Sequence, residues 1–247
     1  MSGKKETELN MFTKLTPEYT KELVEGELGI NSLKFIDIVN NIGTNKKLVD
    51  LGVETGKSSR ILLNNAIEKN NIVYGVDPIP NMGQDILSNP NYRYLAADSV
   101  KTGKEWKDGP VDVIFVDTIH AKEQVLSELH YWWDILNEGG YVIFHDTAWE
   151  GYIHKPNHPC AGRKTGNTGM GYDYYGGVAW ETPDKAVKLF FGLNELKDYE
   201  DEYIKLEHGP KDLGMTFVFK KKHKNYKSNI NNWNLIFDKR DYLIKNS

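Results

Sequence analysis

The sequence has a single cysteine, Cys160, among 247 residues, which excludes an internal disulfide and a cysteine-rich zinc site. Its purely apolar runs, such as Val113–Val116, last only a few residues, whereas a membrane-spanning helix needs about 20. The first ten residues, MSGKKETELN, lack the apolar stretch of a signal peptide. From these absences we expect a soluble, cytoplasmic protein that does not bind a membrane.

Neither sign of charge dominates, because 31 basic and 35 acidic side chains give a net charge of −4. Residues 221–247 alone carry seven basic and two acidic side chains, a net charge of +5, which leaves −9 for residues 1–220. An acidic body offers no general attraction to nucleic acid phosphates and suits a cationic cofactor and a metal ion better. Six Trp, 14 Tyr and nine Phe argue against disorder for most of the chain.

The chain begins with two helical patterns. Thr16 precedes Pro17 and Glu18, a combination typical of a helix N-terminus. Residues 31–43 then place apolar side chains at helical spacing and end at a glycine. We therefore expect residues 1–45 to form a helical extension ahead of the main fold.

Short apolar segments then alternate with segments of helical length, notably residues 58–69 and 121–136. Segments this apolar are typical of strands that are covered on both faces, and the alternation predicts a doubly wound α/β sheet of parallel strands. The five expected strands are residues 47–51, 71–76, 92–96, 111–116 and 141–144.

This alternation stops after Asp146. Residues 147–177 are rich in glycine and have no periodicity, and we expect a functional loop there. A capped helix is expected from Thr182 to about Leu196, and the two strands expected after it are residues 203–207 and 215–220.

We expect one domain over residues 1–247, because no repeat or low-complexity segment divides the chain. Its core would be residues 46–220, and residues 221–247 would be a basic tail that ends in a weakly amphipathic segment.

Polar residues and glycines follow the first predicted strand, where an open parallel sheet binds its ligands. Either the glycines let a ligand approach the backbone, or they only serve a tight strand-to-helix turn. Their G-x-x-x-G spacing matches neither the dinucleotide fingerprint G-x-G-x-x-G nor the P-loop. The positions concerned are Asp50, Gly52, Glu54, Gly56 and Ser58.

Acidic residues also follow the second and third predicted strands. A carboxylate at Asp77 can accept hydrogen bonds from both hydroxyls of a ribose, or it is a solvated strand end. Asp98, followed by Ser99, can accept a hydrogen bond from an adenine amino group, and it is equally well placed to cap a helix.

Two carboxylates and two imidazoles follow the fourth and fifth predicted strands. Asp117 and His120 come after one strand, and His145 and Asp146 end the next, so we expect these side chains to lie close together. Burying two carboxylates together is costly unless a cation compensates them, and few oxygen ligands suggest Mg²⁺. His120 has the natural pKa of a general base, whereas ordinary capping and solvation is the alternative interpretation.

Five motifs in this order and spacing resemble those of class I S-adenosylmethionine-dependent methyltransferases. They are VDLGVETGKSS, GVDPIP, LAADSV, VDVIFVDTIH and GGYVIFHDT, and the resemblance covers about residues 45–220. It implies a Rossmann-like, mostly parallel, seven-stranded sheet whose last strand is antiparallel.

The resemblance also implies a role for each matching position. Asp50, Gly52, Glu54 and Gly56, with Ser58, would surround the methionine part of S-adenosylmethionine. Asp77 would bind its ribose, and Asp98 with Ser99 would flank its adenine. Asp117 would lie beside the cofactor and, with Asp146, hold the metal ion, while His120 would take the proton of the substrate hydroxyl.

Within this class, the chain looks most like small-molecule O-methyltransferases, which include the catechol, macrolide-sugar and rhamnosyl or cephalosporin groups. The implied substrate is a hydroxyl group of a small molecule or sugar. His145 stands where that group has a carboxylate or an amide, and an imidazole is a poorer Mg²⁺ ligand. His145 therefore either joins the metal ligands or contacts the substrate as a second base.

Other functions stay open at this point. A nucleic-acid or protein methyltransferase, or an interaction protein that binds S-adenosylmethionine without catalysis, would share the same sheet. A nicotinamide-dependent reductase would need G-x-G-x-x-G, which the chain lacks. The N-terminal helices and the basic tail are candidate interfaces of a homo-oligomer.

Overall fold

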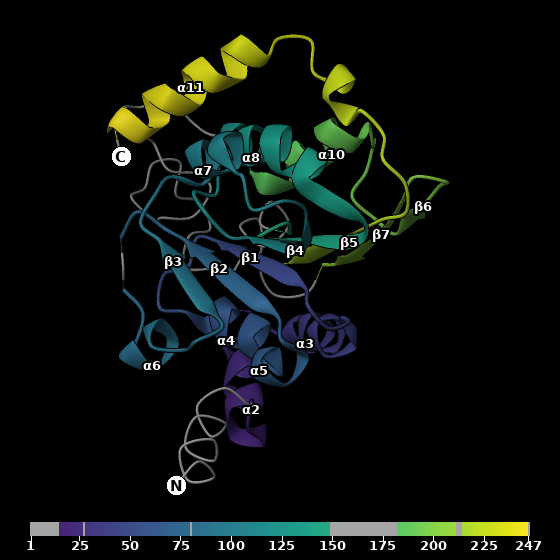
Figure 1. The fold of residues 1–247 in the computed structure, drawn as a ribbon. Coiled ribbons are helices and arrows are strands. Elements are labelled where there is room, and N and C mark those ends of the chain that lie inside the picture. Colours follow the sequence, from purple (N-terminus) through teal and green to yellow (C-terminus); the bar gives the residue numbers. More distant parts are fainter. Residues whose placement is uncertain (1–14, 27, 80, 149–181, 211–213, 247) are drawn as a thin grey trace, which may run out of the picture.

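A single eight-stranded sheet runs through the computed structural model, which describes residues 15–148 except 27 and 80, and residues 182–246 except 211–213 (Figure 1). The strand order is β3-β2-β1-β4-β5-β8-β7-β6, and every pairing among β1 to β5 is parallel. The strands are β1 (Lys47–Leu51), β2 (Ile72–Val76), β3 (Tyr92–Leu95), β4 (Val111–Val116), β5 (Leu136–His145), β6 (Tyr199–Glu200), β7 (Ile204–Gly209) and β8 (Met215–Lys220).

Each of the last three strands runs antiparallel to its neighbour in the sheet. Strand β8 pairs antiparallel with β5, β7 with β8, and β6 with β7. The predicted Rossmann-like, doubly wound, mostly parallel sheet is confirmed, but the predicted count of seven strands is one too low. The additional strand is β6, whose two residues pair with Leu206 and Lys205 and are too few to give a periodic signal.

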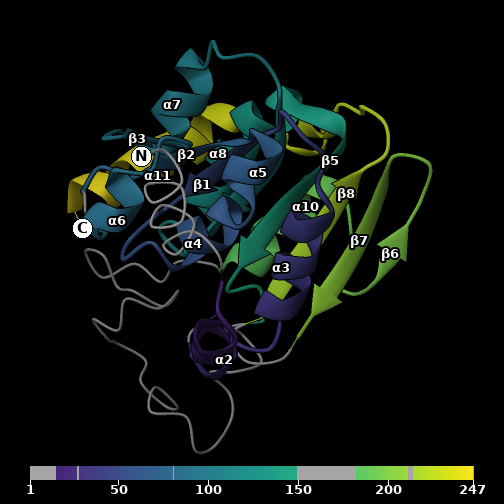
Figure 2. The ribbon, with the colours of Figure 1, turned by 60° about the horizontal axis from the view of Figure 1, so that its bottom comes forward.

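Helices cover both faces of this sheet. On one face lie α7 (Ser99–Glu105), α8 (Lys122–Ile135), α10 (Pro183–Phe191) and α11 (Trp233–Asn246), while α3 (Ser32–Asn41) and α4 (Lys57–Leu63) cover the other (Figures 1 and 2). The remaining helical segments are α2 (Pro17–Glu25), α5 (Ala66–Lys69), α6 (Gln84–Leu87) and η1 (Tyr226–Asn229).

Alternate residues of the central strands belong to two separate apolar clusters. Val49, Leu51 and Ile114 pack with α8 and α10, whereas Leu48 and Phe115 pack with α3 and α4. On the α3 face, the Phe35 and Phe115 rings stack at 4.8 Å. Because both faces are buried, every second residue must be apolar on each side, which explains the continuous apolar runs of the sequence.

Three predicted boundaries are wrong. The expected helix over residues 58–69 is two helices, because Asn65 adopts a left-handed conformation (φ 60°) that asparagine tolerates, and its side chain bonds to Asn40 at 3.0 Å. The strand expected from residue 141 begins at Leu136, with a register shift near Val111. Helix α10 ends at Phe191 rather than near Leu196, since Gly192 takes the left-handed C-cap conformation.

The C-terminal segment packs on the sheet-covering helix α8. His130 of α8 contacts Trp233 and Phe237 of α11 with ring-centroid distances of 4.4 and 5.2 Å.

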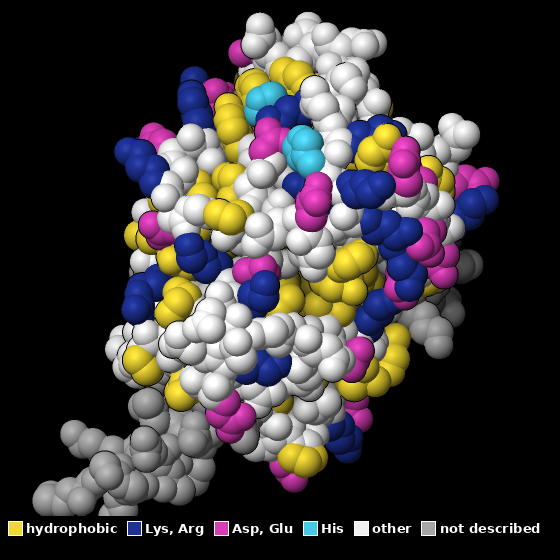
Figure 3. All heavy atoms as spheres, turned by 45° about the vertical axis from the view of Figure 1, so that its right-hand side comes forward, with side chains coloured by type: hydrophobic (Ala, Val, Ile, Leu, Met, Phe, Trp, Pro, Cys, Tyr) yellow, Lys and Arg dark blue, Asp and Glu magenta, His cyan; other side chains and the backbone are white. Residues whose placement is uncertain are grey.

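The glycine-rich loop predicted for residues 147–177 lies outside the described residues from residue 149 onward. Among the described helices, none combines the length and apolar character needed to cross a membrane. On the face in Figure 3, basic and acidic side chains are interspersed with apolar ones.

Candidate active site

The turn after β1 brings the ends of three strands together. Gly52 has φ +84°, and a Cβ there would lie 2.0 Å from the carbonyl oxygen of Asp117, so that only glycine fits. Its N–H donates to Val76 at 3.0 Å, and the N–H of Asp117 donates to Leu51 at 2.9 Å. Gly56 also has a positive φ of +87°, but the atom its Cβ would meet is the Cδ1 methyl of Ile86, which can move aside. The turn itself therefore requires glycine at position 52 and favours it at position 56, whether or not a ligand approaches them.

Asp50 lies beneath this turn and is not exposed to solvent. Its side chain is fully buried, and Oδ2 accepts hydrogen bonds from Ser58 at 2.8 Å and from Ser59 at 2.5 Å. Burial raises the pKa of Asp50 to about 7 despite these two hydroxyl donors. Oδ1 has no hydrogen-bond partner among the described residues.

Asp77 ties the turn after β1 to the end of β2. Its Oδ2 accepts hydrogen bonds from the N–H groups of Val53 at 3.0 Å and Glu54 at 3.2 Å, and Oδ1 accepts one from Ile79 at 2.8 Å. Each carboxylate oxygen has two lone pairs, so Asp77 keeps the capacity to accept further hydrogen bonds.

Asp98 and Ser99 are fixed by α7, α8 and α11. Asp98 is the N-cap of α7, accepting from the N–H of Lys101 at 2.8 Å, and it forms an ion pair with Arg240. Of the two interpretations of Asp98, the helix cap is thus observed, and an adenine contact stays a prediction. Ser99 is buried and donates to Glu128 Oε1 at 2.6 Å.

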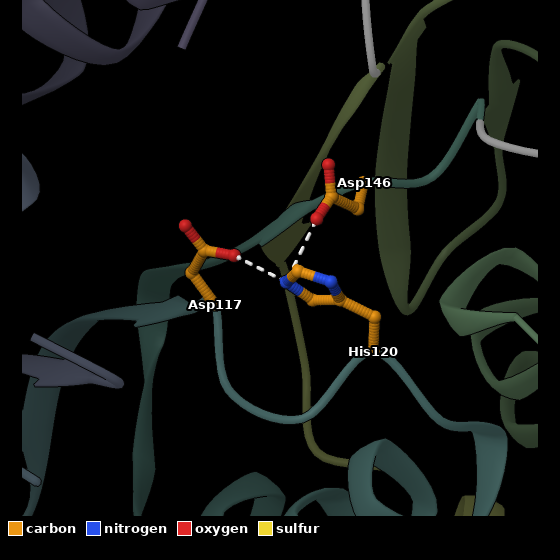
Figure 4. A group of neighbouring side chains, drawn as sticks. All are labelled: Asp117, His120 and Asp146. Carbon is orange, nitrogen blue, oxygen red and sulfur yellow. Dashed lines mark hydrogen bonds and ion pairs between the residues drawn. The ribbon is translucent and has the colours of Figure 1, made fainter. Parts of the chain in front are cut away.

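A group of two imidazoles and two carboxylates forms at the ends of β4 and β5, three members of which appear in Figure 4. His120 Nε2 lies 2.8 Å from Asp146 Oδ2 and 3.3 Å from Asp117 Oδ1. His145 Nδ1 lies 3.3 Å from both Asp117 Oδ1 and Asp146 Oδ1. The convergence expected from the sequence is therefore present, and Asp146 holds a left-handed backbone (φ 56°) to make it.

Opposite charges determine the protonation of this group. Burial alone would lower the pKa of His120, but the carboxylates of Asp146 and Asp117 outweigh it and raise that pKa to about 10. The pKa of His145 is likewise raised well above its usual value, against burial, by Asp117 and Asp146. In return, the two imidazoles hold the pKa values of Asp117 and Asp146 below the usual range, although burial acts in the other direction.

The same atoms fit a divalent cation. One donor atom from each of Asp117, His120 and Asp146 lies within 4.8 Å of the others. Ligand atoms about 2.1 Å from a metal lie roughly 3.0 Å apart in octahedral and 3.4 Å apart in tetrahedral geometry. The two separations measured from His120 Nε2, 2.8 and 3.3 Å, are close to these values. His120, predicted only as a base, thus belongs to the candidate metal-binding group.

The fold and the strand-end residues define a class of protein. A parallel sheet closed by an antiparallel hairpin, with acidic residues after β1, β2, β3 and β4, is the arrangement of class I S-adenosylmethionine-dependent methyltransferases. Residues 49–147 match the model of a family described as a methyltransferase domain. Over this segment the chain therefore resembles a methyltransferase domain. No curated protein matches it by sequence.

Solved structures share this fold at low sequence identity. The methyltransferase PaMTH1 of Podospora anserina, bound to S-adenosylhomocysteine (SAH), matches with a TM-score of 0.55 at 17% identity over 87% of each chain. A candidate caffeoyl-CoA O-methyltransferase of Staphylococcus aureus matches with a TM-score of 0.52 at 15% identity, over 88% of this chain and 98% of that one.

MycE of the mycinamycin biosynthetic pathway, in complex with Mg, SAH and mycinamycin VI, matches with a TM-score of 0.50 at 15% identity. The match covers 87% of this chain and about half of MycE, 53% of its length. At these identities the three structures establish the fold of this chain and not its substrate.

Proposed function

We propose that the protein transfers the methyl group of S-adenosylmethionine to a hydroxyl group of a small molecule or sugar, with the help of a divalent cation such as Mg²⁺. The observation that carries this proposal is the convergence of Asp117, His120 and Asp146 at the carboxyl ends of adjacent parallel strands. A base and a pair of oxygen ligands side by side are what the activation of a hydroxyl requires. MycE, whose structure contains Mg and SAH, supports the pairing of a metal ion with this fold.

The cofactor would lie along the ends of β1, β2 and β3. The buried Oδ1 of Asp50, which has no hydrogen-bond partner among the described residues, is compatible with a polar ligand group at the turn that contains Gly52, Glu54, Gly56 and Ser58. The carboxylate of Asp77 would hold the ribose, and Ser99 with Asp98 would flank the adenine. S-adenosylmethionine supplies a methyl group on a positively charged sulfur, which suits the acidic body of the chain.

The residues of the chain then align the reaction. Methyl transfer is an in-line displacement in which the hydroxyl oxygen forms a bond to the methyl carbon while the carbon–sulfur bond breaks. The hydroxyl proton moves to Nε2 of His120, which can accept it only while the cation is held by Asp117 and Asp146 and not by that nitrogen. A divalent cation held by Asp117 and Asp146 would neutralise these carboxylates, so that they would no longer keep His120 protonated. A bound cation supplies Lewis acidity that lowers the pKa of a coordinated hydroxyl.

The donor set bears on which cation binds. Carboxylates suit Mg²⁺ and Mn²⁺, whereas imidazoles suit transition metals such as Zn²⁺. Because His120 and His145 both approach the carboxylates, Mn²⁺ is expected to support at least as much turnover as Mg²⁺.

The test is methyl transfer to a panel of catechols, hydroxylated aromatics and glycosides, read by the mass of each acceptor. We expect one acceptor class to gain a methyl group, and we expect a chelator to abolish the gain and added Mg²⁺ or Mn²⁺ to restore it. His120→Gln should lower kcat by about 10²- to 10⁴-fold, because a general base contributes that much. His223→Gln, at an exposed histidine whose backbone N–H bonds to Glu138 near the opposite end of β5, is the matched control and should leave kcat unchanged.

Two results would contradict the proposal. Undiminished turnover in His120→Gln would remove its role as the base. Methylation of nucleic acid or protein, with every small hydroxyl compound untouched, would replace the substrate class.

A further inference from the structure

Helix α11 reaches the candidate cofactor site through one buried arginine. In Figure 1, α11 crosses above α7 and α8, and Arg240 lies in its second half. Arg240 is 8% exposed, its Nε donates to Gln124 Oε1 at 2.8 Å, and its Nη2 pairs with Asp98 Oδ2. A single guanidinium therefore joins the N-terminus of α7 to α8 and α11, as its planar set of donors permits.

Gln124 connects Arg240 to Ser99, the first residue of α7, directly after the loop that follows β3. Its Nε2 donates to Ser99 Oγ at 3.0 Å and to Glu128 Oε1 at 2.7 Å. All three side chains are buried, so their hydrogen bonds are shielded from water and hold a defined geometry. Asp98 and Ser99, the residues expected to flank the adenine, are thus both connected to Arg240.

One turn beyond Arg240, α11 contacts the loop after β4 as well. Leu243 is fully buried and packs with Ala121 and Ile119. These two residues lie on either side of His120 in the sequence. The same helix therefore touches the two loops on which the adenine end of the cofactor and the candidate base depend.

The sheet itself does not set the distance between these loops. In the strand order β3-β2-β1-β4, the strands that carry them are separated by two others, so no hydrogen bond joins β3 directly to β4. Two helices span this gap. Helix α8 begins directly after the loop that carries His120, and its Trp132 donates to the backbone of Ser99 at 3.0 Å. Helix α11 reaches both loops with side chains, Arg240 at Asp98 and Leu243 at Ala121.

We propose that Arg240 is a positioning residue for cofactor binding, and that α11 holds the loops after β3 and β4 at the spacing that the adenosine part of S-adenosylmethionine needs. This inference rests on the proposed cofactor site. It assigns to the basic tail a role in cofactor binding by the same chain.

The test compares Arg240→Ala, Arg240→Lys and Leu243→Ala with Lys239→Ala, an exposed cation on the same helix. For each variant, SAH affinity is measured by calorimetry, the melting temperature by scanning calorimetry, and kcat and KM for S-adenosylmethionine by turnover. We expect Arg240→Ala to weaken SAH binding and raise KM about tenfold, with kcat at saturation within about twofold of wild type. Lys239→Ala should behave as wild type.

Arg240→Lys should recover part of the affinity, because one ammonium can bond to Asp98 or Gln124 but lacks the geometry to hold both. Arg240→Ala and Gln124→Ala should not be additive, since each breaks the same chain of hydrogen bonds. If Arg240→Ala fails to fold, Arg240→Lys and Leu243→Ala must still show weakened SAH binding at temperatures where they are folded.

Unchanged SAH affinity in the folded Arg240 variants, with or without a lower melting temperature, would overturn the inference and leave the proposed function intact. A wild-type chain that binds no SAH would overturn both. The two failures are therefore distinguishable in one set of titrations.

Discussion

His120, Asp117 and Asp146 show how far residue-level chemistry can be predicted from sequence. Their convergence follows from strand ends alone, because parallel neighbours such as β4 and β5 end at the same edge of a sheet. Arg240 could not be found in this way. It lies 142 residues from Asp98 in the sequence, on a segment whose only signal was weak amphipathicity and positive charge.

Glu128 is a buried acid whose ionisation should affect stability. Burial raises the pKa of Glu128 to about 7, although Ser99 and Gln124 donate hydrogen bonds to it. The folded state therefore favours the protonated acid, while the unfolded chain has its ordinary pKa near 4.5. The stabilisation is complete below that value and is lost as the pH rises through about 7.

We expect the free energy of unfolding of the wild type to fall between pH 5 and pH 7 relative to Glu128→Gln, by about 3 kcal/mol at most, because one pKa unit corresponds to about 1.4 kcal/mol. Urea denaturation at a series of pH values measures the difference. Glu105→Gln, at an exposed acid, is the control and should follow the wild type. Parallel pH profiles for wild type and Glu128→Gln would show that Glu128 ionises normally in the folded protein.

At the scale of elements, the strands were easier to predict than the ends of helices. Two buried faces force continuous apolar runs, so β1, β2 and β4 could be placed from sequence alone. The break between α4 and α5 depends on Asn40, 24 residues away from Asn64 in the sequence, and no local pattern contains that contact. Residues 199–200 form β6 only because β7 is beside them.

The turn between β1 and α4 gives a test at this scale. Gly52 and Gly139 both have positive φ, but a Cβ at Gly52 would overlap the carbonyl group of Asp117, while at Gly139 nothing lies within 4 Å. Gly139→Ala should cost about 1 kcal/mol of stability, which is the cost of a left-handed alanine. Gly52→Ala should cost more than about 3 kcal/mol, because the ends of β1 and β4 must also separate.

Urea denaturation of the two glycine variants provides the comparison, and SAH titration of Gly52→Ala provides a second readout. Equal losses of stability would mean that the close approach of β1 and β4 is not what requires glycine at position 52.

For the whole molecule, the positive charge of residues 221–247 and the negative charge of residues 1–220 bear on how the two parts pack. The basic C-terminal segment packs on the acidic body through Arg240, Leu243 and the ring contacts of His130, instead of extending away from it. The sequence predicted the charge of this segment correctly but gave no sign of its partners. Its position next to the predicted adenine end of the site connects the overall architecture to cofactor binding.

The central claim is that this sheet binds S-adenosylmethionine at the ends of β1 to β4. A calorimetric titration of the full chain with SAH tests it most directly, with Asp77→Ala as the site variant and Asp134→Ala, at a partly exposed acid of α8, as the control. The account predicts saturable binding of one SAH per chain, about tenfold weaker in Asp77→Ala and unchanged in Asp134→Ala. No saturable heat with the folded wild-type chain, or equal affinity in the Asp77 variant, would contradict it.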